Sequence, residues 1–159
     1  MKKEIYSSIC SQVYSTLKEG EGLTIYMEGE NSQYFRFNDS KIRQTGIIED
    51  YKVTLSLYHG KKSLQATTTV SSDIDYSVNN LISEINSLRE PLSLIPDNNF
   101  TVFPIKFDSL DMHRKGDLPQ REEILDSLMD VINKDKLTGV WTSGKIFRAS
   151  STSEGTSHW

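Results

Sequence analysis

Three histidines are the residues of this chain best suited to bind a transition metal or to act as a general base. They are His59, His113 and His158; none belongs to an HExxH motif, and none stands near a pair of cysteines. His59 precedes Gly60 in an expected turn, His113 lies in a polar stretch, and His158 is next to the last residue. A zinc site needs several converging ligands, so the favoured interpretation is three surface histidines and no metal site in this chain.

The serine and cysteine residues also lack the sequence motifs of a catalytic nucleophile. The segment TSGK, residues 142–145, lacks the flanking glycine of a G-x-S-x-G elbow and the long glycine-framed run of a phosphate-binding loop. Cys10 is the single cysteine and lies beside an expected helix stripe with no basic neighbour, which favours a buried thiol over a reactive one. Carboxylate pairs such as Glu122 and Glu123 are interpreted as solvated charges. The residues by themselves therefore predict no catalytic site.

The composition limits the class of protein. The chain has 159 residues, of which 36% are hydrophobic, which is enough for a single domain, residues 1–159, with a core of its own. Its formal net charge is −4 and its lysines and arginines are scattered, so nucleic-acid binding is disfavoured. No N-terminal apolar run is long enough for a signal peptide or a membrane span. These features predict a soluble, cytoplasmic protein with no nucleic-acid or membrane partner.

Two segments have the apolar spacing of helices that bury one face. The first covers residues 5–17, and Gly20 and Gly22 stop its pattern. The second covers residues 74–88, with Ser72 and Asp73 as candidate N-caps, and Pro91 is expected to end it. The two stripes consist of Ile5, Ile9, Val13 and Leu17, and of Ile74, Val78, Leu81, Ile82, Ile85 and Leu88.

Between these helices lie five short runs rich in β-branched and aromatic residues, which are expected to be consecutive strands. They are residues 23–28, 33–38, 41–48, 52–59 and 63–70, separated by the turn compositions GENS, DS, EDY and GKK. Val53, Leu55 and Leu57 alternate with polar residues, so one face is apolar and the other carries hydroxyl groups. No intervening stretch is long enough for a helical crossover, so the strands are expected to be antiparallel.

The remainder combines an irregular segment, a helix and a strand. Residues 91–117 contain three prolines and are expected to be mostly irregular, with TVF at residues 101–103 as one candidate strand. A third helix is expected to begin around Pro119, and residues 137–151 form a last strand with a bulge or hairpin at Gly144. The buried face of that helix would carry Ile124, Leu125, Leu128 and Val131 or Ile132. The order of elements predicts an α+β fold, an antiparallel β-meander sheet with helices packed on one face.

Residues 34–70 and 146–159 carry a series of short motifs that occur together in one protein family. A polar turn is followed by x-I-x-Q-x-G, then by a y-x-G-k turn and a Thr/Ala-rich strand, and the end of the chain leads from a strand into Ser-x-Gly and an aromatic residue. The corresponding elements are Ile42, Gln44 and Gly46, the turn at 58–61, the run at 66–69, and the ending IFRASSTSEGTSHW. This arrangement resembles the N-terminal domain of the TldD/PmbA family of zinc metallopeptidases, which are modulator of DNA gyrase-like proteins.

The resemblance implies a non-catalytic domain that shapes the cleft for unfolded or peptide substrates. In the family a C-terminal domain with HExxxH and further ligands holds the zinc, so this chain is expected to bind no cofactor and to be inactive alone. The parent protein is expected to be a hydrolase that acts in proteolysis as a homo- or heterodimer. The chain would then be a domain cut from its catalytic C-terminal partner.

Four residues near the end of the chain are the candidate substrate-binding residues. They are Arg148, Ser153, Glu154 and Gly155, which lie where the sheet would meet the missing domain. A sheet edge offers a physical route to the same function, because it accepts an extended peptide through main-chain hydrogen bonds. The competing interpretation treats Arg148 as a solvated strand residue and Glu154 as a loop charge.

Two alternatives stay open at this point. The chain could be a free-standing, non-enzymatic binding module that presents the polar face of its sheet to a protein or peptide; the residues of that face are Thr54, Ser56, Thr67 and Thr69. A reading frame that continues past Trp159 into a segment with His-Glu would favour the peptidase domain, and a stop codon would favour the module. The serine-rich end could also be disordered, although a large aromatic residue is costly to leave in water.

Overall fold

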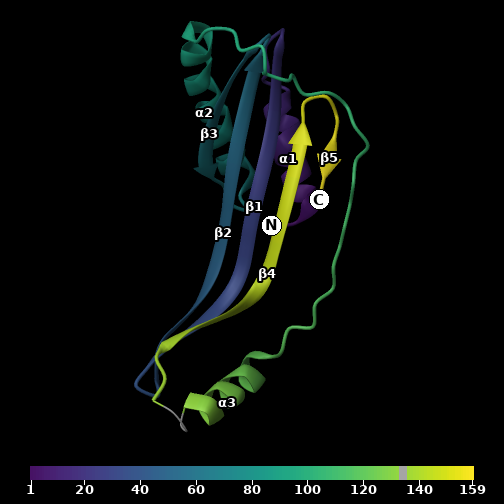
Figure 1. Cartoon of the computed structure of the whole chain (residues 1–159). Helices are drawn as coiled ribbons and strands as arrows, with labels where there is room; N and C mark the ends of the chain where they lie inside the picture. Colours follow the sequence, from purple (N-terminus) through teal and green to yellow (C-terminus); the bar gives the residue numbers. More distant parts are fainter. Residues whose placement is uncertain (133–135) are drawn as a thin grey trace. The chain divides into compact units, whose positions relative to one another are not determined.

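The computed structural model describes residues 1–132 and 136–159, which form three helices and five strands (Figure 1). The elements are α1 (Lys3–Tyr14), β1 (Glu21–Asn38), β2 (Lys41–His59), β3 (Lys62–Thr69), α2 (Ile74–Leu94), α3 (Arg121–Ile132), β4 (Gly139–Thr152) and β5 (Ser157–His158). The strands make one antiparallel sheet in the order β3-β2-β1-β4-β5, so the predicted α+β class and the β1–β2–β3 meander are confirmed. No helix within the described residues is long and apolar enough to cross a membrane.

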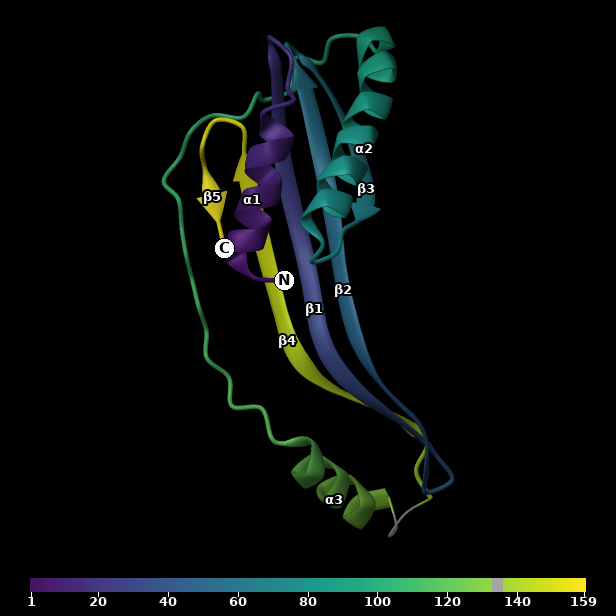
Figure 2. The ribbon, with the colours of Figure 1, turned by 180° about the vertical axis from the view of Figure 1, so that it is seen from behind.

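The chain divides into two compact units. The first comprises Met1–Gly29, Asp50–His113 and Phe147–Trp159, and the second comprises Glu30–Glu49 and Arg114–Ile146. Strands β1, β2 and β4 contribute residues to both. Both helices of the first unit, α1 and α2, cover the same face of the sheet (Figure 2).

The core of the first unit lies between that sheet face and the two helices. Val53, Leu55 and Leu57 of β2 are all fully buried, and their polar neighbours in the sequence alternate with them as expected. The helix stripes meet this face through Val13 of α1 and Leu81 of α2, among others. Each such side chain contributes about 1.5–3 kcal/mol when it leaves water. The predicted arrangement of helices on the apolar face of β2 is therefore confirmed.

Helix α1 ends at Tyr14, earlier than the apolar spacing to Leu17 predicts. The hydroxyl groups of Ser15 and Thr16 donate to carbonyl oxygens of the last turn and so divert the chain out of the helix. Leu17 still packs against the core from the loop that follows. The stripe thus identified the correct apolar residues but placed the end of the helix one turn too late.

Helix α2 continues through Pro91 to Leu94, so the prediction that Pro91 ends it is wrong. A proline inside a helix costs about 3 kcal/mol through a lost hydrogen bond and a clash. Two contacts offset that cost in the last turn. Leu92 is buried in the core, and the Nζ of Lys62 donates to the carbonyl oxygen of Ser93 over 2.9 Å. Tertiary contacts after the proline therefore keep the helix going.

The turns expected at GENS and EDY are also wrong, because β1 and β2 run through them without a break. Gly29 does not form a turn: the ring of Phe147 lies where its Cβ would be, so glycine permits a close approach inside the sheet. Tyr51 is a buried strand residue whose carbonyl oxygen accepts a 2.9 Å hydrogen bond from the N–H of Val70. The two other turns, at residues 39–40 and 60–61, are present as predicted, with positive φ at their first residues.

Strand β4 continues through Gly144, so the hairpin expected there is wrong. A Cβ on Gly144 would overlap the backbone and Cβ of Ser32, which shows that the glycine lets two strands approach closely. The candidate strand at residues 101–103 is irregular in the structure.

Helices α2 and α3 begin at side-chain caps. The Oδ1 of Asp73 accepts from the N–H of Tyr76 over 3.0 Å, which confirms Asp73, the second of the two predicted N-cap candidates of α2. In α3 the expected face is only partly buried: Ile124 is buried and Leu125 and Leu128 are half-buried. Val131 is exposed, contrary to one of the two alternatives, and the side chain of Ile132 lies outside the described residues.

The second unit is centred on one aromatic side chain that sequence spacing did not single out. Phe35 of β1 is fully buried, its ring centroid is 5.6 Å from that of Trp141, and the guanidinium carbon of Arg121 lies 5.2 Å from the Phe35 centroid. Contact with a cation over the ring face adds about 0.5–1 kcal/mol or more. Arg121 thus attaches the first turn of α3 to this ring, whereas Val131 near the end of the helix is exposed.

Candidate functional site

The segment after β4 is ordered. Gly155 has φ +92° and donates its N–H to the carbonyl oxygen of Thr152, after which β5 pairs with β4. The ring of Trp159 stacks on Phe147 with centroids 5.4 Å apart and approaches Tyr6 at 5.8 Å. The disordered-tail alternative is therefore wrong, and Trp159 packs against the core of the first unit.

Arg148 lies in the middle of β4 and is 73% exposed. Its Nε is 3.3 Å from the Oε1 of Glu28, and the same carboxylate oxygen accepts a hydrogen bond from the Tyr26 hydroxyl. An exposed ion pair of this kind contributes at most about 1 kcal/mol and leaves the guanidinium open to a ligand.

Ser153, Glu154 and Gly155 form one turn between β4 and β5. Ser153 is tied to the start of β1, because its N–H donates to the Leu23 carbonyl oxygen and its Oγ accepts from the Leu23 N–H. Glu154 is exposed and accepts a hydrogen bond from Ser153. Arg148 is five residues earlier in the extended strand, about 17 Å away at about 3.3 Å per residue. The structure therefore brings three of the four candidate residues together and leaves Arg148 apart from them.

Buried hydroxyl and thiol groups meet between α1 and β4. The Tyr6 and Tyr14 hydroxyls lie 3.2 Å and 2.6 Å from the Oγ of Ser151, and Cys10 is buried beside them. Burial raises the pKa of the Cys10 thiol to about 11, so it is protonated at neutral pH. The predicted buried thiol is confirmed, and the cluster stabilises the core without supplying a nucleophile.

The histidines stand in three separate places. His59 ends β2, His113 is an exposed residue of the irregular segment, and the Nε2 of His158 is 3.1 Å from the carbonyl oxygen of Asp108. Among residues 1–132 and 136–159 no three His, Cys, Asp or Glu side chains are grouped so that they could hold a metal ion. The described residues therefore offer no ligand set for zinc, which the family resemblance places in a C-terminal domain.

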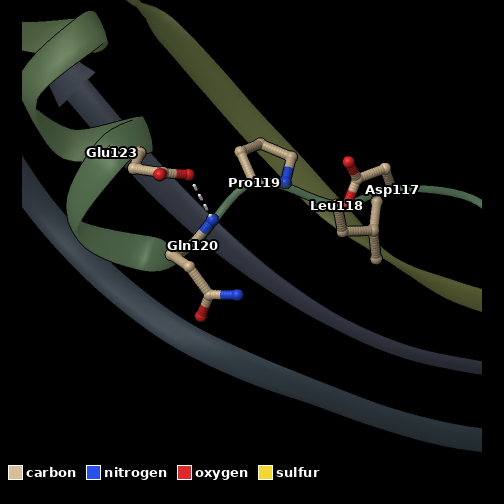
Figure 3. Close-up of a pocket in the computed structure, with 5 residues that line it drawn as sticks. All are labelled: Asp117, Leu118, Pro119, Gln120 and Glu123. Carbon is tan, nitrogen blue, oxygen red and sulfur yellow. Dashed lines mark hydrogen bonds between the residues drawn. The ribbon is translucent and has the colours of Figure 1, made fainter.

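A hollow of about 360 Å³ lies at the start of α3 in the second unit (Figure 3). It is lined by Asp117, Leu118, Pro119, Gln120 and Glu123. The Oε2 of Glu123 accepts a 2.9 Å hydrogen bond from the Gln120 N–H, which is half of a capping box. The polar groups of this hollow therefore serve to cap α3, and we assign no binding function to it.

A second hollow of about 380 Å³ lies in the first unit, where α2 ends and the strands β1 and β3 begin. Its lining residues are Lys18, Glu21, His59, Lys62, Arg89, Leu92 and Ser93. The Nε and NH2 groups of Arg89 donate to the two carboxylate oxygens of Glu21 over 2.9 and 2.8 Å. These bonds hold the pKa of the Glu21 carboxyl below its ordinary value and raise the pKa of Arg89.

One edge of the sheet has free main-chain groups. Because Val70 donates to Tyr51, these two residues form a hydrogen-bonded pair of the antiparallel ladder. Every second residue of β3, counted back from Val70, therefore bonds to β2. The residues between them point their N–H and C=O groups away from β2. The carbonyl oxygen of Thr69 is already occupied by the Asn80 side chain. The edge residues with no main-chain partner in the described chain are Ser63, Gln65 and Thr67, here called the β3 edge.

At the opposite end of the strand order, β5 is covered by the irregular segment. Leu110 donates to Ser157 and accepts from Trp159, and Met112 donates to Trp159, all over 2.8–3.0 Å. The irregular segment thus lies against β5 like a further strand, so within the described residues β5 does not present an open edge.

Comparison with known proteins gives the same fold at low sequence identity. No protein-family profile and no curated protein matches the sequence. TldE from Thermococcus kodakarensis matches with a TM-score of 0.64 and 12% identity, over 97% of this chain and 37% of that protein. Two proposed modulators of DNA gyrase, from Thermotoga maritima and Bacteroides thetaiotaomicron, match with TM-scores of 0.60 and 0.58 and 12% identity.

These matches cover 96% and 98% of this chain, but only 36% and 37% of the two gyrase-modulator proteins. The chain therefore spans little more than a third of the length of its structural neighbours. Over almost all of its own length, it has the fold found in proteins of the TldD/PmbA type.

Proposed function

We propose that this chain is a non-catalytic domain of a TldD/PmbA-type metallopeptidase and that it binds unfolded or peptide segments. The observation that carries the proposal is the fold shared with TldE over 97% of the chain. The zinc chemistry belongs to another domain or subunit of the working enzyme, because the described residues do not provide a ligand set. The cytoplasmic site of action and the homo- or heterodimeric assembly are parts of the same proposal.

The β3 edge is the surface we assign to the peptide. Ser63, Gln65 and Thr67 offer outward N–H and C=O groups, to which an extended chain adds as a further strand. Each such hydrogen bond contributes about 0.5–1.5 kcal/mol net, so several are needed for useful affinity. Their side chains are uncharged, so recognition rests on the main chain and tolerates many sequences. That tolerance suits an unfolded substrate.

The alternative of a free-standing module would use the polar face of the sheet. On that face the Thr54 and Thr67 hydroxyls are 3.3 Å apart, and the Gln65 amide donates to the Oγ of Ser56, which is itself buried. Because these groups already bond to one another, fewer remain for a protein partner. The β3 edge is therefore the better candidate for the surface that binds a peptide.

Amide hydrogen exchange with and without an unstructured peptide tests the edge directly. We expect slower exchange at Ser63, Gln65 and Thr67, and no change at Leu64 and Ala66, whose N–H groups already bond to β2.

A pair of variants at one position completes the test. Gln65→Pro removes an outward N–H without breaking the ladder to β2, as is tolerated on edge strands. We expect peptide affinity to fall about ten-fold or more. Gln65→Ala keeps the N–H and should bind as the wild type does. Unchanged affinity in the folded proline variant would rule out the edge.

A further inference from the structure

Beyond peptide binding, we propose that the hollow at the end of α2 binds an oxyanion, either a phosphate group or a carboxylate. Among its lining residues, we call the exposed Lys18 and His59 and the half-buried Lys62 the rim. We call the more deeply buried pair of Arg89 and Glu21 the floor. The cationic side chains of the lining are Lys18, Lys62 and Arg89, and Glu21 is its one carboxylate. The hollow thus carries an excess of positive charge, although the formal net charge of the protein is −4. A local excess of positive charge in a concave site concentrates anions.

The single carboxylate in the hollow is not available to neutralise the rim. Glu21 accepts both hydrogen bonds from Arg89 and a third from the main-chain N–H of Lys18, over 2.8–2.9 Å. The side chains of Glu21 and Arg89 are only 7% and 16% exposed, so the pair is a fixed part of the floor. The charges of Lys18 and Lys62 therefore remain uncompensated within the hollow.

The rim is held in place before any ligand arrives. The main chain of Lys18 is clamped by two reciprocal bonds with Glu21, since the Glu21 N–H also donates to the Lys18 carbonyl oxygen. Lys62 is anchored to α2 through Ser93 and retains two further donors on its Nζ. The imidazole of His59 lies against Gly20, where φ is +78° and an added Cβ would be 3.2 Å from the Nε2.

The chemistry of these donors selects the ligand class. The Nε and NH2 groups of Arg89 already donate to Glu21, so recognition of a ligand rests on the ammonium groups of Lys18 and Lys62. Ammonium groups bind phosphate and carboxylate oxygens as point charges. No described residue accepts a hydrogen bond from the Nζ of Lys18, which leaves this group free for a ligand. The volume of about 380 Å³ is within the range of small-molecule sites and admits a phosphate ester or the end of a peptide.

The test measures binding of inorganic phosphate and of acetate by NMR titration at constant ionic strength. We expect saturable shifts of amides around Lys18 and Lys62 with phosphate, with chloride as the reference ion. Shifts with phosphate alone assign the site to phosphate groups, and shifts with both ions assign it to oxyanions in general. If neither phosphate nor acetate gives saturable shifts, the proposal is overturned.

Charge-removing variants separate a built site from general attraction. Lys18→Gln should weaken phosphate binding about ten-fold, because it deletes the free ammonium while leaving the main-chain clamp in place. Lys61→Gln is the matched control, since Lys61 is exposed and its Nζ bonds to Asn99 outside the hollow. Equal losses in the two variants would show non-specific attraction and refute the site.

Discussion

Leu55→Asp provides the sharpest test of the core. Leu55 is 0% exposed in β2, opposite Ala66 of β3 and beneath the helices. Truncating such a side chain costs about 3–5 kcal/mol, and a buried carboxylate with no partner adds several kcal/mol more. The total is close to the whole stability of an ordinary domain, about 5–15 kcal/mol. The variant should therefore be largely unfolded at 25 °C, as measured by circular dichroism.

Two companion variants make the result quantitative. Leu55→Ala should lower the free energy of unfolding by about 3–4 kcal/mol and the melting temperature by about 6–15 °C. Ile47→Asp introduces the same residue into the same strand, but Ile47 is 71% exposed, so its effect should stay within about 0.5 kcal/mol. A Leu55→Asp protein that melts within a few degrees of the wild type would refute the burial assignment. Equal destabilisation by Ile47→Asp would show that strand propensity, rather than burial, causes the loss.

Three further predictions concern ionic, thiol and catalytic chemistry. Arg89→Ala should destabilise the fold by about 2–4 kcal/mol at pH 7, because it leaves the Glu21 carboxylate without its charged partner. Since Arg89 holds the pKa of Glu21 below its usual 4.5, the difference in stability from wild type should persist above that pH and shrink as pH falls through the folded pKa. Urea denaturation that gives the same difference at every pH would contradict this. The buried thiol of Cys10 should react with a disulfide reagent only in denaturant, and rapid labelling of the native protein would disprove its burial. The purified chain should not cleave an unstructured protein, with or without zinc, because the described residues offer no ligand set for the metal. Joining it to a C-terminal half bearing His-Glu should restore cleavage. Chelator-sensitive turnover by the chain alone would reveal a catalytic site within it.

The candidate site could be predicted only in part from the sequence. Composition indicated a polar sheet face and a possible edge for peptide binding, but nothing local says which strand is outermost. β3 is an outer strand because β4, which follows β1 by about a hundred residues, pairs on the far side of β1, and the irregular segment covers β5 at the other end of the strand order. The anion-binding hollow collects residues from the end of α2 and from loop and strand ends far apart in the chain. Such contacts leave no periodic signal in a single sequence.

The sequence by itself determined the fold class, the buried faces of the first unit and the N-cap of α2, because these follow from the alternation and spacing of neighbouring residues. Leu55 in its strand and Asp73 at its cap needed no distant partner to be recognised. Only the tertiary structure decided that β1 continues through Gly29, that α2 passes Pro91, and that Trp159 packs against the core. At each of these points a distant contact of a few kcal/mol outweighs the local preference: Phe147 over Gly29, Leu92 in the core, and Trp159 against Phe147. Local conformational preferences of about 1 kcal/mol per residue are outweighed by one such contact. At Pro91 the local cost is about 3 kcal/mol, so the burial of Leu92 and the hydrogen bond from Lys62 to Ser93 act together.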